Sequence, residues 1–464
     1  MTKSEVLGTQ PIGKLLAQQA IPASIGFAVM SMNMVVDTIF VGKYIGDLAI
    51  SAISIVVPIS FFMSSFGMSI GMGGASIISR ALGENNKDRA QLSFNNQITL
   101  TAFFMALFLV LGFAFQSQII TLYGAKAGML DLTNAYYEIV MLGIPFLTLS
   151  MMANNNLRAE GKPKVAMLAL LIPSLLNMVL DWLFISQYGW GMEGAAWATT
   201  ISYLATGAFM VFYFLRGKTE LKIIPKLFKL DWKIVGQIFS VGSVSLIRQV
   251  AISILTIVLH AMLFSYGKEI EGLGGEAAIG VYAIITRISM FAFFPLIGIA
   301  QGFVPIAGYN YGAKKFDRVQ EAVKISVKIG LYFGIGLCGL LLIFSESIPL
   351  LFAKDSSSVL IEYAPKAIFI IFLMTPVVIF QLIGASFYQA LGRGKPALLL
   401  TLTKQLFFLT PFVLILPPLL GLEGIWWSFP IADVLSGLVC WYYLRKGVKK
   451  MLAESQQENE TILT

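Results

Sequence analysis

Residues 15–42 read LLAQQAIPASIGFAVMSMNMVVDTIFVG, and the only ionisable side chain among them is Asp37. About 20 apolar residues, at a rise of 1.5 Å each, form a helix that crosses the hydrocarbon core of a bilayer. A carboxylate within such a helix costs about 3 kcal/mol or more, so it usually faces a bundle interior or a wet cavity. The stretch therefore predicts a membrane-spanning helix that carries a functional acid.

Eleven further apolar segments of similar length follow it in the chain. Their approximate limits are 48–79, 95–121, 134–157, 165–187, 193–215, 234–265, 277–307, 321–346, 359–390, 397–419 and 423–444. Of the 464 residues, 57% are hydrophobic and 12% are charged, whereas soluble domains carry about 25% charged residues. The predicted fold class is therefore an all-α polytopic membrane protein with 12 transmembrane helices.

The distribution of Lys and Arg in the loops predicts the orientation of the chain. Alternate loops and the two termini hold 24 of the 33 basic residues, and the remaining loops hold 4. Basic loops stay on the cytoplasmic side, so both termini are expected in the cytoplasm. The net charge of +8 is then a topology signal, and we expect the lipid bilayer, not nucleic acid, as the surroundings of the protein. The polar stretch from Met1 to Lys14 lacks the pattern of a cleavable signal peptide.

Three short motifs recur in the same order in the two halves of the chain, at the nearly constant sequence offsets of 229, 233 and 230. The matched pairs are GENNKDRAQ at 83–91 with GAKKFDRVQ at 312–320, Gly-Lys-Pro at 161–163 with 394–396, and Glu-Gly at 193–194 with 423–424. Each offset spans an even number of predicted helices, which makes the two repeats parallel and places the substrate between them.

The repeat and a long basic loop at the centre of the chain predict four segments. These are an N-terminal six-helix lobe at 1–215, a cytoplasmic linker at 216–233, a C-terminal six-helix lobe at 234–446 and a polar cytoplasmic tail at 447–464.

Asp37 and Asp181 are expected at one depth in the N-terminal lobe. Both lie, with Thr199, about 12–14 Å along their helices from the nearest outer loop. Asn33 and Asn177 stand four residues before the two acids, on the same helical faces. Such oxygens suit a hard cation such as Na⁺, and two crowded carboxylates also suit a proton. The alternatives are that Asp37 pairs with a basic residue and that Thr199 bonds only its own helix backbone.

Other polar residues in the spans have two possible roles each. Asn154 either lines a cytoplasmic vestibule or caps the end of the fourth span. Lys404 is expected to extend its ammonium group towards the cytoplasm. Asp433 either forms a structural pair with another side chain or has a role in transport. Three side chains of the seventh and eighth spans either line a substrate cavity or extend towards the membrane surface: Arg248, His260 and Arg287.

The chain shows no catalytic constellation, so we do not expect an enzyme. Phosphate-binding Gly-rich loops with a Lys are missing, which argues against ATP as the energy source. Cys338 and Cys440 lie in apolar runs and His260 is the single histidine, so neither a cofactor nor a metal beyond Na⁺ is expected. The remaining energy source is an ion gradient.

Three stretches resemble the MATE (multidrug and toxic compound extrusion) transporters, and together the resemblance covers essentially the whole chain. They are MNMVVDTIFVG at 32–42, RAEGKP at 158–163, and the Asn177-x3-Asp181 pair followed by GAAWAT at 194–199. The resemblance implies a V-shaped molecule in which two six-helix lobes enclose a central cleft. It implies export of cationic, amphipathic drugs in exchange for Na⁺ or H⁺.

The resemblance also implies specific roles for individual residues. The N-lobe cation site of the family corresponds to four residues here: Asp37, Asn177, Asp181 and Thr199. Pro22 corresponds to a proline whose kinking is linked to protonation of that site. The NorM branch carries further acids in its seventh and tenth spans, and this chain has His260 in the former and no acid in the latter. We therefore expect an ion site in the N-lobe only.

The function we expect is secondary active multidrug efflux. The protein would be a multi-pass monomer of a bacterial inner (plasma) membrane, with both termini in the cytoplasm. The alternative is a lipid-linked oligosaccharide flippase of the same superfamily, in which Arg248 and Arg287 would face a pyrophosphate.

Overall fold

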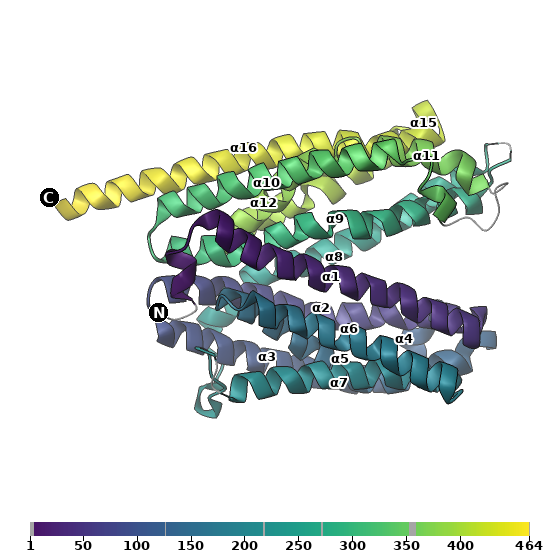
Figure 1. Ribbon diagram of the computed structural model, residues 1–464, viewed down its shortest axis with the longest axis horizontal. Coiled ribbons are helices and arrows are strands. Elements are labelled where there is room, and N and C mark those ends of the chain that lie inside the picture. The colour runs from purple at the N-terminus through teal and green to yellow at the C-terminus, as the bar shows by residue number, and fades with distance from the viewer. Residues whose placement is uncertain (1–3, 126, 217–218, 271, 352–358, 464) are drawn as a thin grey trace. The chain divides into compact units, whose positions relative to one another are not determined.

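The computed structural model describes residues 4–125, 127–216, 219–270, 272–351 and 359–463, and the regular structure within these ranges is helical (Figure 1). Twelve helices among the described residues are long and apolar enough to cross a membrane. The predicted all-α fold with 12 transmembrane helices is therefore confirmed.

The first six spans are formed by seven helical elements, and a short α4 (Gln116–Leu122) follows the third span. The spans are α1 (Ile12–Tyr44), α2 (Asp47–Gly83), α3 (Lys87–Ala114), α5 (Leu130–Ala159), α6 (Pro163–Asp181) continued by the π-helical η3 (Trp182–Gln187), and α7 (Gly191–Leu215).

The second six spans are more interrupted. They are α8 (Trp232–Gly267), α9 (Gly275–Gly312), α10 (Phe316–Ile343), α11 (Val359–Phe372) with α12 (Val378–Ala390), α13 (Gly394–Leu402) with the π-helical η7 (Thr403–Leu409), α14 (Thr410–Ile415) and α15 (Pro417–Leu420), and α16 (Leu422–Leu463).

The chain forms two compact units. Unit 1 comprises residues 1–10 and 21–246, and unit 2 comprises residues 11–20 and 247–464. The boundaries at residues 20/21 and 246/247 fall inside helices α1 and α8 and not in loops. Pro22 is buried and is the second residue of the part of α1 that belongs to unit 1.

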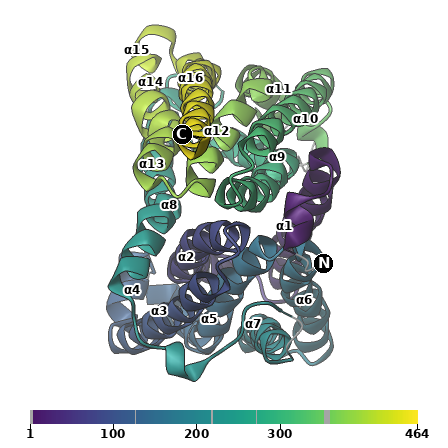
Figure 2. The same cartoon turned by 90° about the vertical axis from the view of Figure 1, so that its left-hand side faces the viewer.

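Unit 1 is a bundle with α5 at its centre, packed against α2, α3, α6 and α7 (Figure 2). Two glycines one turn apart on α2 allow close packing against α5. A Cβ on Gly67 would stand 2.2 Å from the Thr148 carbonyl oxygen, and one on Gly71 would stand 2.8 Å from the Cα of Met152. Small residues with this spacing let membrane helices approach backbone to backbone.

Replacing Gly67 with alanine is expected to destabilise unit 1 by about 1–3 kcal/mol, because the added methyl group must push a packed backbone aside. The midpoint of thermal unfolding of purified protein in detergent would measure the loss. Gly336→Ala on α10 is the matched control, since its Cβ would meet nothing within 4 Å. Equal midpoints for the two variants would contradict the close packing.

The backbone confirms the internal repeat at the first matched motif. Asn85 and Lys314 are the non-glycine residues with positive φ among those described, at 58° and 55°. The two turns also have equivalent hydrogen bonds. Asn86 N donates to Ala81 O and Lys315 N donates to Asn310 O, both at 2.8 Å. The sequence offset of 229 therefore relates positions with equivalent local structure.

The second matched motif needs a correction by two positions. Gly161 and Gly392 each have φ of +73°, which favours glycine. Lys162 N donates to Leu157 O and Arg393 N donates to Tyr388 O, both at 2.8 Å. The turn after the tenth span is therefore built on Gly392 and not on Gly394. The offset becomes 231, close to the 229 and 230 of the other two motifs.

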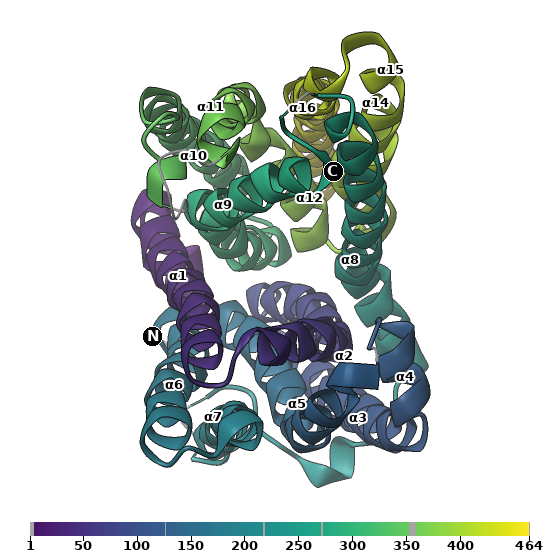
Figure 3. The ribbon, with the colours of Figure 1, turned by 90° about the vertical axis from the view of Figure 1, so that its right-hand side faces the viewer.

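Unit 2 departs from the predicted continuous spans at two places, and Figure 3 shows its helices from the other end. The tenth span is broken between α11 and α12 by a 3-10 turn at Thr375–Val377. Pro376 lies in this turn, and proline cannot donate a helical hydrogen bond. The eleventh span is divided by η7 and again at Pro417. The last helix continues past residue 447 to Leu463, so the predicted polar tail prolongs a helix.

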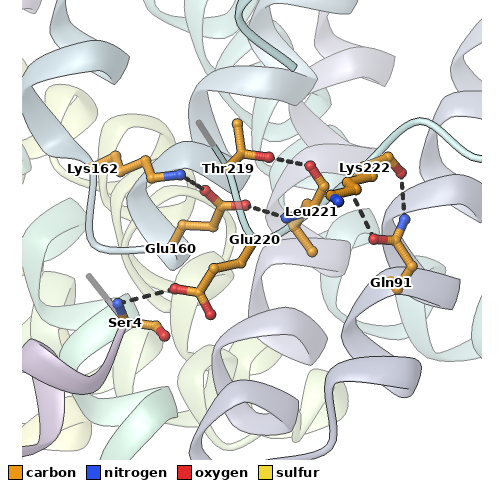
Figure 4. A network of polar contacts seen from close by, with 8 residues as sticks. All are labelled: Ser4, Gln91, Glu160, Lys162, Thr219, Glu220, Leu221 and Lys222. Atoms are coloured by element: carbon orange, nitrogen blue, oxygen red, sulfur yellow. Dashed lines mark hydrogen bonds and ion pairs between the residues drawn. The ribbon is translucent and has the colours of Figure 1, made fainter. Parts of the chain in front are cut away.

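The described part of the linker, from residue 219 onwards, is bound along its length to α3. Gln91 exchanges two hydrogen bonds with the backbone of Lys222 (Figure 4). One turn further along α3, Asn95 Oδ1 accepts from the backbone N–H of Ile224 at 2.9 Å. Another turn on, Thr99 Oγ1 donates to the Phe228 carbonyl at 3.2 Å. The spacing of four residues places these polar side chains on one face of the helix.

A buried ion pair binds the start of the same linker segment. Glu160 and Lys162 form this pair, and their side chains are 0% and 3% exposed. Glu160 Oε1 also accepts a hydrogen bond of 2.9 Å from Leu221 N, and Glu220 Oε1 accepts one of 3.3 Å from Ser4 N (Figure 4). Burial raises the pKa of Glu160, and the neighbouring Lys162 ammonium lowers it to a smaller extent. Desolvation of the carboxylate thus outweighs the attraction of its partner.

Candidate functional site

A cavity of about 350 Å³ lies inside unit 1, between α1, α2, α5, α6 and α7. Its wall is mainly apolar, with methionines, valines and prolines from these helices. Among the residues that line it are four of the polar residues predicted from the sequence: Asn33, Asp37, Asn177 and Thr199. Concave, mostly apolar sites with a few convergent polar groups are the usual form of a small-molecule site.

The two acids meet next to this cavity. Asp181 is fully buried, at 0% exposure, and its side chain contacts that of Asp37. Asp37 Oδ1 is buried and has no hydrogen-bond partner among the described residues. An unpaired carboxylate oxygen at this position is costly, so the site is suited to a cation or a proton that would satisfy it.

Asn177 connects the acids to the neighbouring helices. Either orientation of its amide keeps a contact with Asp181, at 3.4 Å to Oδ1 or 3.2 Å to Oδ2. Asn33 lies 2.6 Å from the same amide, on α1. The turn spacing that predicted a shared face for Asn177 and Asp181 therefore does bring their side chains together.

Thr199 shows both of the arrangements considered from the sequence. Its hydroxyl donates to the Ala195 carbonyl of its own helix at 3.0 Å. The same oxygen also lies 3.4 Å from Asn177 Nδ2. The hydroxyl therefore contacts both its own helix backbone and the amide that lies beside the acids. Asp37 forms no ion pair with a basic residue among the described part of the chain, and no basic side chain lines the cavity.

Two tyrosines of the site were not identified from the sequence. Tyr136 of α5 is 3% exposed, and its side chain lies beside that of Thr199. Tyr203 of α7 lies near Asp37, and both tyrosines line the cavity. Tyr203 follows Thr199 by one helical turn, and this spacing is a signal that could have been used. Tyr136 has no such spacing to another residue of the site, since it is the only one on α5.

Asp181 is the last residue of α6, where the helix widens into the π-helical η3. Such π-helical turns are rare and frequently lie at functional sites. The site therefore gathers two carboxylates, two amides, a hydroxyl and two phenols. Five or more oxygens around a small volume suit a hard monovalent cation, and the adjacent carboxylates also suit one shared proton.

The remaining predicted residues lie elsewhere. Asn154 is not among the residues that line the cavity, and it donates to the Ala166 carbonyl at 2.5 Å and accepts from Arg158 Nε at 3.1 Å. It therefore connects α5 to α6. Three further candidates belong to unit 2 and do not contribute to this site: Arg248, His260 and Arg287. The ring of His260 packs edge-on against Tyr282, with centroids 6.2 Å apart.

Lys404 does not extend towards the membrane surface as predicted from the sequence. Its ammonium nitrogen lies 2.6 Å from Asp433 Oδ1, within unit 2. An ammonium that finds a carboxylate within reach gains more than one that moves to the interface, which explains the difference.

Comparisons with known proteins agree with this architecture. The MatE family model matches the chain twice, at residues 22–183 and 250–414. The multidrug export protein MepA of Staphylococcus aureus (strain NCTC 8325 / PS 47) is 27% identical over 432 residues, which is 92% of each chain. MepA of Staphylococcus haemolyticus (strain JCSC1435) is 27% identical over 435 residues, or 93% of each.

A solved structure has the same fold. The outward-facing multidrug resistance MATE family transporter of the MOP superfamily superposes with a TM-score of 0.90 at 23% identity, covering 98% of this chain and 99% of that one. The two matches of the family model coincide with the two repeats of the fold and together span most of the chain. The protein is therefore a member of the MatE family.

Proposed function

We propose that this protein is a multidrug efflux transporter that exports amphipathic, cationic compounds in exchange for Na⁺ or H⁺. Membership of the MatE family and the multidrug export names of the relatives support the export function. The observation that carries the exchange is the contact between Asp37 and Asp181 beside a cavity in unit 1. The relatives are named for drug export, which favours efflux over the flippase alternative.

The acids provide the coupling between the two flows. A Na⁺ ion or proton that arrives at Asp37 and Asp181 neutralises the charge that a cationic drug would use. The free energy of binding can drive a conformational change only as far as the ion binds the two conformations with different affinities. Pro22 supplies such a difference, because a helix that lacks one backbone hydrogen bond bends more easily there. Ion binding then favours the conformation that releases the drug.

The chain is a multi-pass membrane protein, since 12 of its helices can cross a bilayer and its family consists of membrane transporters. We further propose a bacterial plasma membrane and cytoplasmic termini, for which the distribution of basic residues in the loops is the support. We also propose that the monomer is the working unit, because one chain carries both repeats and the whole N-lobe site.

Transport in proteoliposomes tests the exchange. Purified protein would be reconstituted, ethidium loaded, and Na⁺ and H⁺ gradients imposed one at a time. We expect at least one gradient to increase the rate of ethidium movement, because both ions fit the oxygens of the site. Liposomes without protein provide the control for passive leak. Equal rates with and without both gradients would contradict antiport.

A further inference from the structure

Unit 2 contains a charged group in the middle of its spans that the N-lobe site does not include. Asp433 of α16 accepts from Lys404 Nζ at 2.6 Å and from Gln381 Nε2 at 3.0 Å, both on Oδ1. The Asp433 side chain is 5% exposed and that of Lys404 is 20% exposed. Asp433 lies ten residues after Glu423, about 15 Å along the helix from the nearest loop.

The pair is costly as a purely structural element. Two charges taken out of water lose several kcal/mol of hydration each, and apolar residues of similar volume are often as stable or more stable. Ionisable residues inside membrane spans are for this reason usually functional. If the pair had only a structural role, apolar side chains such as leucine at positions 404 and 433 would stabilise the fold as well.

The corrected repeat shows where this group stands. The offset of 231 pairs Gln381 with Ser150 and Lys404 with Pro173, and the offset of 230 pairs Asp433 with Tyr203. Each of those three N-lobe residues lines the cavity of unit 1. The charged group of unit 2 thus occupies positions that line a cavity in the other repeat.

The chemistry at those positions differs between the repeats. The same offsets pair the N-lobe residues Asn177, Asp181 and Thr199 with three phenylalanines: Phe408, Phe412 and Phe429. These three pack against the apolar core of unit 2. At these positions unit 2 has one carboxylate and three phenylalanines, where unit 1 has five or more oxygens.

We propose that Asp433 is the binding group for an organic monocation in unit 2, and that Lys404 is an internal cation that occupies it when no ligand is bound. The inference rests on the proposed export of cationic compounds and names a residue that binds them. A single carboxylate, with phenylalanines in place of the other oxygens of the N-lobe site, suits a bulky cation through charge and cation–π attraction. It supplies too few oxygens for Na⁺.

Exchange at this site keeps its charge constant. The arriving cation takes the place of the Lys404 ammonium at Asp433, and the flexible four-carbon stem of Lys404 lets the ammonium move away. No bond is made or broken, and Gln381 continues to hold the carboxylate. Return of the Lys404 ammonium to Asp433 competes with the bound cation and so assists its release.

Three variants test the exchange through binding of tetraphenylphosphonium to the purified full chain, measured by equilibrium dialysis. Asp433→Asn is expected to weaken binding at least about tenfold, since it removes the counter-charge. Lys404→Met is expected to tighten binding by a similar factor, because it removes the internal competitor. The double variant K404M/D433N is expected to bind as weakly as the Asp433→Asn variant.

The double variant keeps the test valid if a single charge prevents folding, because it buries no charge. K366M/E423Q is the matched control, since it removes an exposed ion pair of the same unit, with side chains 64% and 49% exposed. Wild-type affinity in K404M/D433N would overturn the inference, as would weaker binding in Lys404→Met protein that folds. Unmodified protein that neither binds this probe nor exports ethidium would contradict the proposed function as well. If the unmodified protein exports ethidium and K404M/D433N binds the probe with wild-type affinity, only the proposed exchange at Asp433 is overturned.

Discussion

The rate of efflux by the Asp181→Asn variant is expected to fall on the order of 100-fold relative to the unmodified protein. This factor lies in the upper part of the range by which two coupled sites affect one another. The amide keeps the size and hydrogen-bonding capacity of the buried side chain, so the fold should persist. It removes the charge that a coupling ion neutralises, and with it the difference between the ion-loaded and ion-free states. Ethidium efflux from cells that express equal amounts of each protein is the measurement.

Asp88→Asn is the matched control for this variant, because it makes the same chemical change in unit 1 at an exposed residue in the first turn of α3. Size-exclusion chromatography of both proteins separates lost transport from lost folding. Asp37→Asn provides a second test of the same site. Export at the unmodified rate by both the Asp181→Asn and the Asp37→Asn protein would remove the acids from the mechanism.

Replacing Glu160 with alanine is expected to destabilise the protein by about 3–5 kcal/mol, because it removes the counter-ion of a buried Lys162. It also removes the acceptor of the Leu221 N–H, which starts the bound part of the linker. The midpoint of thermal unfolding in detergent should fall accordingly. The same measurement on Glu84→Ala, which breaks an exposed ion pair with Arg89, should show a loss below about 1 kcal/mol.

The E160L/K162M variant separates the ion pair from the packing at this place. Leu391 and Arg393 stand at the equivalent positions of the second repeat, so a leucine at position 160 suits the shape of the turn. Removing both charges should restore much of the stability lost in Glu160→Ala. A double variant as unstable as the single one would show that the linker contact, and not the buried charge, dominates.

The helices and the main site were predictable because both depend on patterns along one helix. Apolar runs of sufficient length predict spans, and distance from a loop predicts depth. Asp37 and Asp181 share a depth, and Asn177 shares a helical face with Asp181. These regularities sufficed to bring the residues together, since antiparallel neighbours with short loops have little freedom to shift along one another.

Features that depend on contacts between helices could not be predicted in this way. Lys404 and Asp433 lie on different spans, and neither sequence position indicates the other. Nothing in the sequence connects Tyr136 with Thr199, because the two residues lie on different spans, α5 and α7. Gly392 could be told from Gly394 only by its positive φ, because both lie in one short basic turn.

Two of the three boundaries between the units lie within α1 and α8. A continuous helix passes a movement of one end on to the other end, whereas a flexible loop does not. Asp37 stands 17 residues beyond Ala20, the last residue of α1 that belongs to unit 2, which is a lever of about 26 Å. Pro22 lies near the start of this segment, where proline leaves one helical hydrogen bond unmade. One continuous helix, α1, therefore carries both Asp37 and residues of unit 2.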